Sequence, residues 1–290
     1  MIGALLVSLR PAQWSKNLFV LAPLVFAGGL VDPALVGRGL LAFAVWCAAA
    51  SSVYLVNDLR DRDKDRLHPL KRLRPIANGT LSVATAGGAA LALAAGAFAG
   101  ALYLGTRFSA FLLVYLALNL LYSFGLKNVV IVDVMAVAFG YVLRVEGGAA
   151  AVGVEVSKWI LLCTIFVALF LAFSKRRHEL LLLPDNAAHQ REVLVHYGPT
   201  FLDQMINVVT ASTLLSYALY TLAPETVEKF GTAALIYTLP FVLFGIFRYL
   251  YLVYQVSDQR NPTEAILRDP PSVLNVMLWS AAVIAVIYST

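Results

Sequence analysis

The sequence predicts an all-α integral membrane protein with about nine transmembrane helices, on the basis of three observations. The 290 residues are 60% hydrophobic and only 13% charged, whereas soluble domains carry roughly 25% charged residues. Apolar runs long enough to cross a bilayer recur along the chain, and a helix needs about 20 residues to do so because lipid offers its backbone no other partner. Most of the 22 Lys and Arg residues lie between those runs.

The predicted helices follow one another with mostly short connections. We place them near residues 16–31, 35–57, 80–104, 108–124, 128–146, 157–174, 205–223, 231–254 and 272–289. Basic residues concentrate at the amino terminus and after the second, fourth, sixth and eighth runs, and the positive-inside rule makes this the cytoplasmic side. We therefore expect residues 1–290 to form a single transmembrane domain of the inner (plasma) membrane, with a cytoplasmic amino terminus.

The most polar stretch is YLVNDLRDRDKDRLHPLKRLRPIANG, residues 54–79. Asp58, Asp61 and Asp65 follow the second run at i, i+3 and i+7, so a continuing helix would place them on one face, with Asp63 pointing away. Crowded carboxylates repel one another unless a cation lies among them, and oxygen ligands suit Mg²⁺. The spacing predicts Asp58, Asp61 and Asp65 as catalytic metal ligands, with Asn57 beside them.

The cations that follow the aspartates indicate the substrate. Magnesium is usually held by one or two carboxylates together with substrate phosphates. Lys71, Arg72 and Arg74 follow closely, and arginine can bind two phosphate oxygens at once. The pattern therefore predicts a diphosphate site. The competing interpretation is a solvated loop whose charge only fixes topology; the carboxylate spacing and the cations that follow it favour the metal site.

The same stretch resembles the first aspartate-rich motif, N-D-x-x-D-x-x-x-D followed by basic residues and R-P, of the UbiA superfamily of intramembrane prenyltransferases. The likeness continues in YSFGLKNVVIVD, which contains Tyr122, Lys127 and Asp133. It implies a UbiA-type bundle with a cytoplasm-facing, laterally open active-site cavity, a Mg²⁺ cofactor, and substrate-binding roles for Tyr122 and Lys127. It also leaves room for a homo-oligomer, and it implies no nucleic-acid partner.

The chain departs from that superfamily after the sixth predicted helix, where a second motif, D-x-x-x-D, is usual. The sequence there is FSKRRHELLLLPDNAAHQRE. Lys175, Arg176 and Arg177 replace acidic ligands, and only Glu179 and the more distant Asp185 remain. Because a basic face binds anionic oxygens directly, the second substrate is expected to carry a phosphate.

One branch of the superfamily fits these features. The chain resembles the decaprenyl-phosphate phosphoribosyltransferase branch in three stretches, which are LRPAQWSKNLFVLAPLVFAG, SKRRHEL and NPTEAILRDPPSV. The resemblance implies transfer of a 5-phosphoribosyl group from 5-phosphoribosyl 1-diphosphate to a polyprenyl monophosphate, with release of diphosphate, for cell-envelope sugar donors. The basic cluster 71–74 is assigned to the diphosphate or 5-phosphate and the cluster 175–177 to the 5-phosphate or lipid phosphate, and the two assignments are exchangeable.

The remaining candidates come from single positions. Lys16 and Asn17 begin the first predicted helix and would face the same cavity, although Lys16 suits an interfacial anchor equally well. Asp133 lies inside an apolar run, where an ionised side chain usually faces a cavity or a partner, so we expect it to bind substrate through a ribose hydroxyl, or to contact a metal ion or a lysine. Arg144 is interpreted as having a structural or outer-interface role, and Arg248 as a residue whose long side chain reaches the interface.

Two other functions compete with this interpretation. A prenyltransferase that attaches an isoprenoid to an aromatic or other acceptor would share the first motif, but the absent second motif disfavours it. A secondary transporter would place charges such as Asp133 on a transport path. Transporters commonly show internal repeats, and the sequence contains none that we can identify.

Overall fold

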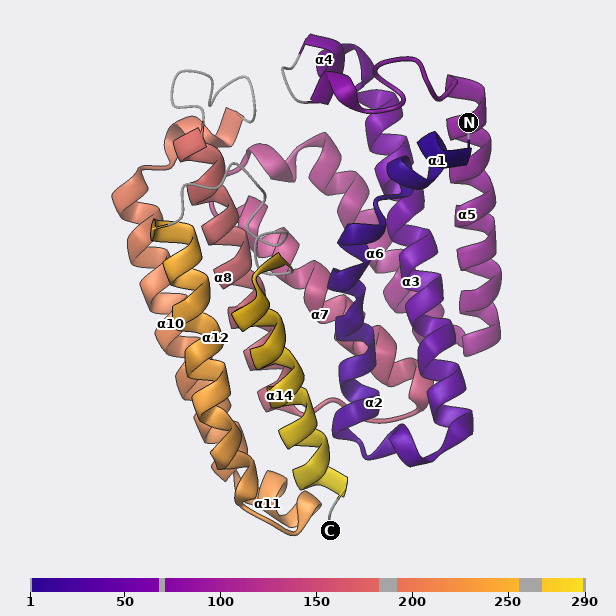
Figure 1. Cartoon of the computed structure of the whole chain (residues 1–290). Helices are drawn as coiled ribbons and strands as arrows, with labels where there is room; N and C mark the ends of the chain where they lie inside the picture. The colour runs from indigo at the N-terminus through magenta and orange to yellow at the C-terminus, as the bar shows by residue number, and fades with distance from the viewer. Residues whose placement is uncertain (1, 68–70, 183–191, 256–267, 289–290) are drawn as a thin grey trace. The chain divides into compact units, whose positions relative to one another are not determined.

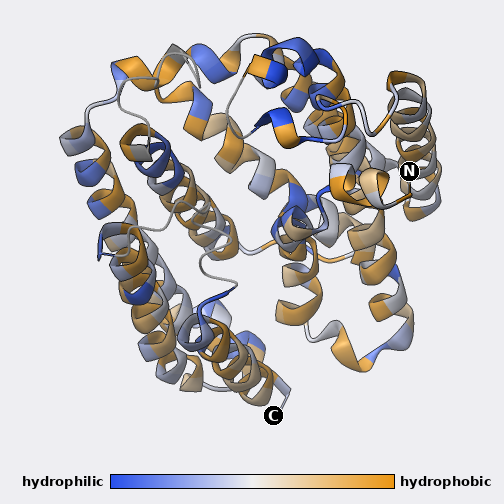
Figure 2. Ribbon diagram, turned by 45° about the horizontal axis from the view of Figure 1, so that its top comes forward, coloured by the Kyte–Doolittle hydropathy of each residue, from blue (hydrophilic) through white to orange (hydrophobic). Residues whose placement is uncertain are grey.

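The structure, a computed structural model, describes residues 2–67, 71–182, 192–255 and 268–288, and within these ranges every regular element is a helix (Figure 1). Eight of the described helices are long and apolar enough to cross a membrane, so the protein is a multi-pass membrane protein. Apolar residues run along the long helices, and polar residues gather at helix ends and connections (Figure 2). The chain forms two compact units, which are described separately.

The first unit comprises Met1–Phe124 and Leu143–Glu155. Its core is the pair α3 and α5, and the last turns of α7 (Val132–Val152) complete it. Its elements in chain order are α1 (Ile2–Leu9), η1 (Pro11–Leu21), α2 (Ala22–Phe26), η2 (Gly29–Val31), α3 (Pro33–Arg60), α4 (Arg62–Leu67), η3 (Lys71–Leu73), α5 (Val83–Leu104) and α6 (Thr106–Phe124).

The predicted first helix, near residues 16–31, is built from shorter pieces. The 3₁₀ helix η1 is followed by the five-residue α2 and then by η2. Pro23 lies in the first turn of α2, where its missing N–H is tolerated, and Gly28 ends α2 with a φ of 76°. The indole of Trp14 donates to Ser51 Oγ of α3 at 3.1 Å. The segment is therefore attached to α3 by side chains, and the described residues contain eight candidate spanning helices instead of nine.

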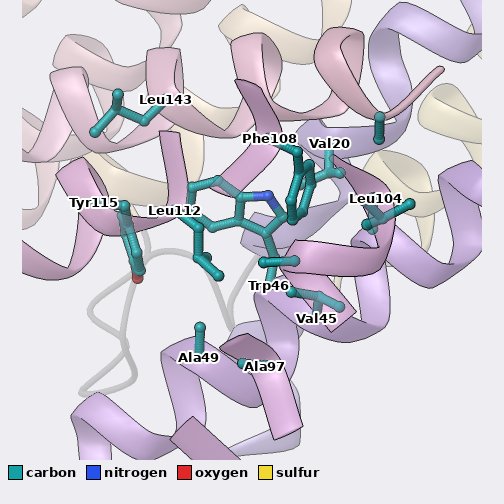
Figure 3. Close-up of a cluster of buried hydrophobic side chains, with 13 residues drawn as sticks. Val20, Val45, Trp46, Ala49, Ala97, Leu104, Phe108, Leu112, Tyr115 and Leu143 are labelled. Carbon is teal, nitrogen blue, oxygen red and sulfur yellow. The ribbon is translucent and has the colours of Figure 1, made fainter. Parts of the chain in front are cut away.

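Trp46 of α3 lies at the centre of the first unit's core and is fully buried (Figure 3). Its ring meets those of Tyr115 and Phe108 edge to face, with centroids 4.7 and 6.5 Å apart. Small residues on α5, Ala97 and Ala101, are also completely or almost completely buried. Small residues let membrane helices approach closely, which strengthens van der Waals packing where lipid removes the hydrophobic driving force.

The end of α7 approaches η1 so closely that only glycine fits. A Cβ added to Gly148 would lie 1.9 Å from the carbonyl oxygen of Val20. We expect Gly148→Ala to lower the free energy of unfolding by about 1–3 kcal/mol, because the backbone must shift to admit the methyl group. Thermal unfolding in detergent measures this. Gly88→Ala is the matched control, since a Cβ there meets nothing within 4 Å; equal melting temperatures for both variants would contradict the close contact.

The second unit comprises Gly125–Val142 and Val156–Thr290. It contains the first turns of α7, and α8 packs closely along α10 while α12 packs against α14. Its other elements are η4 (Leu126–Asn128), α8 (Lys158–Leu182), η6 (Glu192–His196), α10 (Pro199–Leu222), α11 (Pro224–Phe230), η7 (Ala234–Thr238), α12 (Leu239–Gln255) and α14 (Pro270–Tyr288).

An ion pair joins the middle of α12 to the start of α14. Arg248, interpreted from the sequence as a residue reaching the interface, donates to both carboxylate oxygens of Asp269, at 3.0 and 2.7 Å. Asp269 also accepts from the backbone N–H and the hydroxyl of Ser272, and so caps the first turn of α14. The hydrogen bond from Arg248 is the main reason that the pKa of Asp269 lies well below its usual range, and the bonds from Ser272 lower this pKa further.

Candidate active site

The aspartate-rich stretch forms a buried ionic cluster in the first unit. Asp58 and Asp65 are only 3% and 4% exposed. One nitrogen of the Arg74 guanidinium donates to Asp58 Oδ1 at 2.9 Å and to Asp65 Oδ2 at 2.7 Å. Two carboxylates seven residues apart thus converge on a single cation. The structure brings together the aspartates that the i, i+7 spacing predicts to share a face.

The helix that carries these aspartates is interrupted between them. α3 ends at Arg60 and α4 begins at Arg62, with Asp61 between them. Backbone bonds continue the helical turn across the break: Asp61 N–H donates to the Asn57 carbonyl, and Asp65 N–H donates to the Asp61 carbonyl. The register of the two buried aspartates therefore survives the break. Asp63, expected to point away, has a side chain that is 89% exposed.

Arg10 is a member of this cluster that sequence reasoning missed. Its guanidinium donates to Asp58 Oδ1 at 2.6 Å and lies over the Tyr54 ring, 4.9 Å from the centroid. Arg10 has φ 55° and ψ 59° between α1 and η1, a left-handed conformation that costs a non-glycine residue about 1–3 kcal/mol. Arg10 directly precedes Pro11, but no sequence periodicity links it to the aspartates, so the sequence predicts it only as part of the basic amino terminus.

Asn57 is held beside the aspartates by α6. The hydroxyl of Ser123 donates to Asn57 Oδ1 at 3.0 Å. Arg60, one turn further along α3, donates to the Ser123 carbonyl at 3.1 Å and lies 4.2 Å from the centroid of the Phe124 ring. The carboxamide of Asn57 is oriented by these contacts, with its oxygen towards α6.

Asn17 belongs to a second buried polar group of the first unit. It is 1% exposed; its amide donates to Cys47 Sγ at 3.3 Å, and its Oδ1 accepts from Arg144 Nε at 2.8 Å. Arg144 also donates to the Tyr115 hydroxyl at 2.9 Å and lies over the Trp46 ring. Arg144, interpreted from the sequence as structural, therefore fixes η1, the helix that carries both Lys16 and Asn17.

The other predicted substrate ligands lie nearer the surface. Lys71 is half-buried and Arg72 is exposed, both on η3. Tyr122 is half-buried near the end of α6, and Lys127 is half-buried on η4 of the second unit. Among the predicted cations that follow the aspartates, Arg74 contacts both Asp58 and Asp65.

The donor set of the aspartate cluster fits a magnesium ion. In the part of the chain that the structure describes, no three His, Cys, Asp or Glu side chains are placed to hold a metal ion, so two of the three predicted ligands meet and Asp61 does not join them. Asp58 and Asp65 are nevertheless within reach of one cation, because the same Arg74 nitrogen contacts both. One or two carboxylates are what Mg²⁺ usually takes from a protein.

Asp133 and Arg176 form the corresponding buried cluster of the second unit. They are 0% and 2% exposed, and Arg176 Nε donates to Asp133 Oδ2 at 2.6 Å. Arg176 also donates to Glu179 at 2.8 Å. Asp133, expected from its apolar surroundings to have a partner, therefore has one on α8. That this partner is one of the predicted phosphate ligands could not be inferred from the sequence.

Tyr197 completes this cluster and was not identified from the sequence. Its hydroxyl donates to Asp133 Oδ1 at 2.6 Å and accepts from the Ile131 N–H at 2.7 Å. Burial, and the hydrogen bond to Asp133, raise the pKa of Tyr197 above its usual value. Ile131 has φ 67°, which is a rare conformation for a β-branched residue. The turn before α7 is thus held in a strained form by the tyrosine.

The neighbouring cations of α8 also have acidic partners. Arg177 pairs with Asp203 of α10 at 2.5 Å, and its guanidinium lies 3.9 Å from the centroid of the Tyr254 ring of α12. Lys175 lies 3.7 Å from Glu179 and is 37% exposed. The basic cluster is thus neutralised by carboxylates, most of which come from other elements. Asp185 lies outside the described residues, as do residues 261–267, the first part of the stretch NPTEAILRDPPSV.

The comparisons with known proteins agree with the family resemblance seen in the sequence. The model of the UbiA prenyltransferase family matches residues 17–267. The decaprenyl-phosphate phosphoribosyltransferase of Corynebacterium glutamicum is 36% identical over 97% of this chain and 86% of its own length. The Mycobacterium tuberculosis protein of the same name is 34% identical over 98% of this chain and 94% of its own length.

A solved structure shows the same fold. A UbiA homolog from Archaeoglobus fulgidus, bound to GPP and Mg²⁺, superposes with a TM-score of 0.73 at 23% identity, over 98% of this chain and 99% of that one. The fold class predicted from the apolar runs and the motif is confirmed.

Proposed function

Because the chain belongs to the UbiA prenyltransferase family, we propose that it transfers a 5-phosphoribosyl group from 5-phosphoribosyl 1-diphosphate to a polyprenyl, decaprenyl-type, monophosphate. The bond from the ribose C1 to the diphosphate oxygen breaks, and a bond from C1 to an oxygen of the lipid phosphate forms. The observation that carries the proposal is the likeness, along nearly the whole chain, to relatives named for this activity. The reaction takes place on the cytoplasmic side of the membrane. Its product is used to make sugar donors for the cell envelope.

The aspartate cluster is the proposed diphosphate site. Asp58 and Asp65 would hold Mg²⁺, which when bound neutralises the leaving diphosphate; Asp61, the third predicted ligand, does not join them in this structure. Arg74 then has a second role. It contacts both carboxylates in this structure, and with a metal ion on those carboxylates its guanidinium would be free to bind phosphate oxygens in a bidentate manner. Lys71 and Arg72 lie next to it on the chain and add positive charge.

The reaction needs no dedicated base. A phosphate monoester is already an anion at neutral pH, so its oxygen attacks C1 without losing a proton in that step. The protein's part is to position two anionic substrates and to stabilise charge on the diphosphate. Lys175 and Arg177, with Arg176 holding Asp133 in place, are proposed to serve the 5-phosphate or the lipid phosphate. The other proposed substrate contacts are Lys16, Asn17, Asn57, Tyr122 and Lys127.

A turnover assay tests the proposal. Purified protein in detergent is given labelled 5-phosphoribosyl 1-diphosphate and a polyprenyl monophosphate, with Mg²⁺ or with EDTA. We expect diphosphate release that requires both the lipid phosphate and Mg²⁺. Turnover of a prenyl diphosphate with an aromatic acceptor, and none of 5-phosphoribosyl 1-diphosphate, would instead make the protein an ordinary prenyltransferase.

The dual role of Arg74 gives a separate prediction. Arg74→Gln removes the cation that competes with a metal ion for Asp58 and Asp65, so the midpoint of a Mg²⁺ titration followed by thermal shift should fall. The same variant should melt earlier than wild type in EDTA, because two buried carboxylates lose a counter-ion. Arg72→Gln is the control, since Arg72 is exposed. An unchanged Mg²⁺ midpoint in Arg74→Gln would contradict the competition.

A further inference from the structure

An apolar groove lies between the helices of the second unit. Its volume is about 230 Å³, and α8, α12 and α14 supply most of its lining, with Thr213 of α10 contributing. Representative lining residues are Phe170, Leu171, Ile246, Tyr249, Val276 and Trp279. In Figure 1, α12 and α14 run side by side. The third long helix that lines the groove is α8. All four helices are candidate membrane spans, so the groove lies at the depth of lipid chains.

Most polar groups of the groove wall form hydrogen bonds within the protein; the buried hydroxyl of Tyr249 is the exception. The Thr213 hydroxyl donates to the Val209 carbonyl, and the Asn275 amide donates to the Phe241 carbonyl at 2.9 Å. The Ser272 hydroxyl donates to Asp269. The rest of the wall is aliphatic and aromatic. Such a surface favours a hydrocarbon chain over a polar ligand, because a buried polar group without a partner is costly.

The groove ends near a cationic side chain on the same helix face. Val167 and Leu171 line the groove, and Lys175 continues their i, i+4 series on α8. Lys175 lies about 6 Å beyond Leu171 along the helix axis and is 37% exposed. Just beyond it, Arg177 of α8 lies over the Tyr254 ring of α12. An apolar channel that leads to a partly exposed ammonium matches an amphiphile with an anionic head.

We propose that this groove holds the first part of the hydrocarbon chain of the polyprenyl phosphate acceptor, with its phosphate at Lys175. The inference rests on the proposed function and assigns its acceptor to specific residues. Ligand pockets for small molecules are typically about 300–1,000 Å³, so 230 Å³ accommodates a short segment of one chain. The remainder of a long polyprenyl chain lies in the bilayer.

Filling the groove from its rim tests the proposal. Val276 lines the groove and is 54% exposed, whereas Met277, the next residue of α14, is 63% exposed and is not part of the lining. Val276→Trp should raise the KM for a long polyprenyl phosphate by about tenfold or more, while the KM for 5-phosphoribosyl 1-diphosphate stays the same. The effect should vanish with an acceptor of a single isoprene unit, and Met277→Trp should behave as wild type. Equal KM values for Val276→Trp and Met277→Trp would overturn the proposal.

Photo-cross-linking gives an answer that does not depend on turnover. A polyprenyl phosphate with a diazirine near the phosphate end of its chain should label peptides of α8 and α14, and unlabelled polyprenyl phosphate should compete. Labelling of these peptides by a diazirine phosphatidylglycerol that polyprenyl phosphate does not displace would assign the groove to bulk lipid and overturn the proposal. If the labelling succeeds but 5-phosphoribosyl 1-diphosphate is never consumed, the proposed function fails while the lipid groove stands.

Discussion

Asp58→Asn is expected to lower kcat/KM for phosphoribosyl transfer about a thousandfold. Asp58 is buried and accepts hydrogen bonds from both Arg10 and Arg74, so it is the charged centre of the cluster proposed to hold Mg²⁺. A metal ion stabilises developing charge by several kcal/mol, and each 1.36 kcal/mol or so corresponds to about a factor of ten in rate. The assay is diphosphate release at saturating Mg²⁺, together with the thermal shift that Mg²⁺ produces.

Asp63→Asn provides the matched control for this experiment. Asp63 lies in the same stretch and carries the same charge, but its side chain is 89% exposed, with one surface contact, to Arg66 at 3.4 Å. It should keep nearly full activity and a normal Mg²⁺ thermal shift. Comparable losses in the two variants would mean that the stretch acts through its total charge, as a loop that only fixes topology. Retention of activity by Asp58→Asn would remove Asp58 from the proposed metal site.

The two aspartates also show how far sequence reasoning reaches. Their i, i+7 spacing predicted that Asp58 and Asp65 would lie together, and the structure places them on one guanidinium. The same periodicity did not reveal the interruption at Asp61. Nor did it reveal Arg10, which contacts Asp58 across 48 positions of sequence. Local periodicity describes one helix, whereas the counter-ions come from elements whose pairing depends on the tertiary fold.

The apolar runs predicted the long helices well for a similar reason. Length and hydropathy are properties of one segment, and the bilayer imposes the same requirement on each. The segment near 16–31 is the exception. It is apolar, but Pro23 and Gly28 divide it into short helices, which hydrogen bonds such as that from Arg144 to Asn17 hold in place. Hydropathy alone does not report such a division.

The basic cluster of α8 was predicted correctly as a concentration of positive charge, but its neutralisation was not. Arg176 and Arg177 are paired with Asp133 and Asp203, which lie on α7 and α10. These acids are 43 and 26 positions away in sequence, so no motif connects them to the cluster. Lys175 has the most exposed side chain of the three cations. It is therefore the cation of this cluster that a phosphate can reach most easily.

Asp133→Asn is expected to be the most destabilising polar substitution in the second unit. Arg176 is 2% exposed and loses a charged partner at 2.6 Å. Removing one member of a buried ion pair costs up to about 3–5 kcal/mol because the other charge remains away from water, and the pair that Arg176 keeps with Glu179 at 2.8 Å offsets part of this cost. Thermal unfolding in detergent should show this loss, while Lys175→Gln, which breaks the more exposed pair with Glu179, should change stability by less than about 1 kcal/mol.

A double substitution separates this structural role of Asp133 from substrate binding. If the cost comes from an uncompensated buried charge, then replacing both partners, Asp133→Leu with Arg176→Met, should be less destabilising than the sum of the two single changes, since contacting residues are energetically coupled. Simple additivity would contradict the coupling. The folded double variant then reports on chemistry. Normal KM values for both substrates would make Asp133 and Arg176 purely structural, whereas a raised KM for 5-phosphoribosyl 1-diphosphate alone would place the pair at the donor.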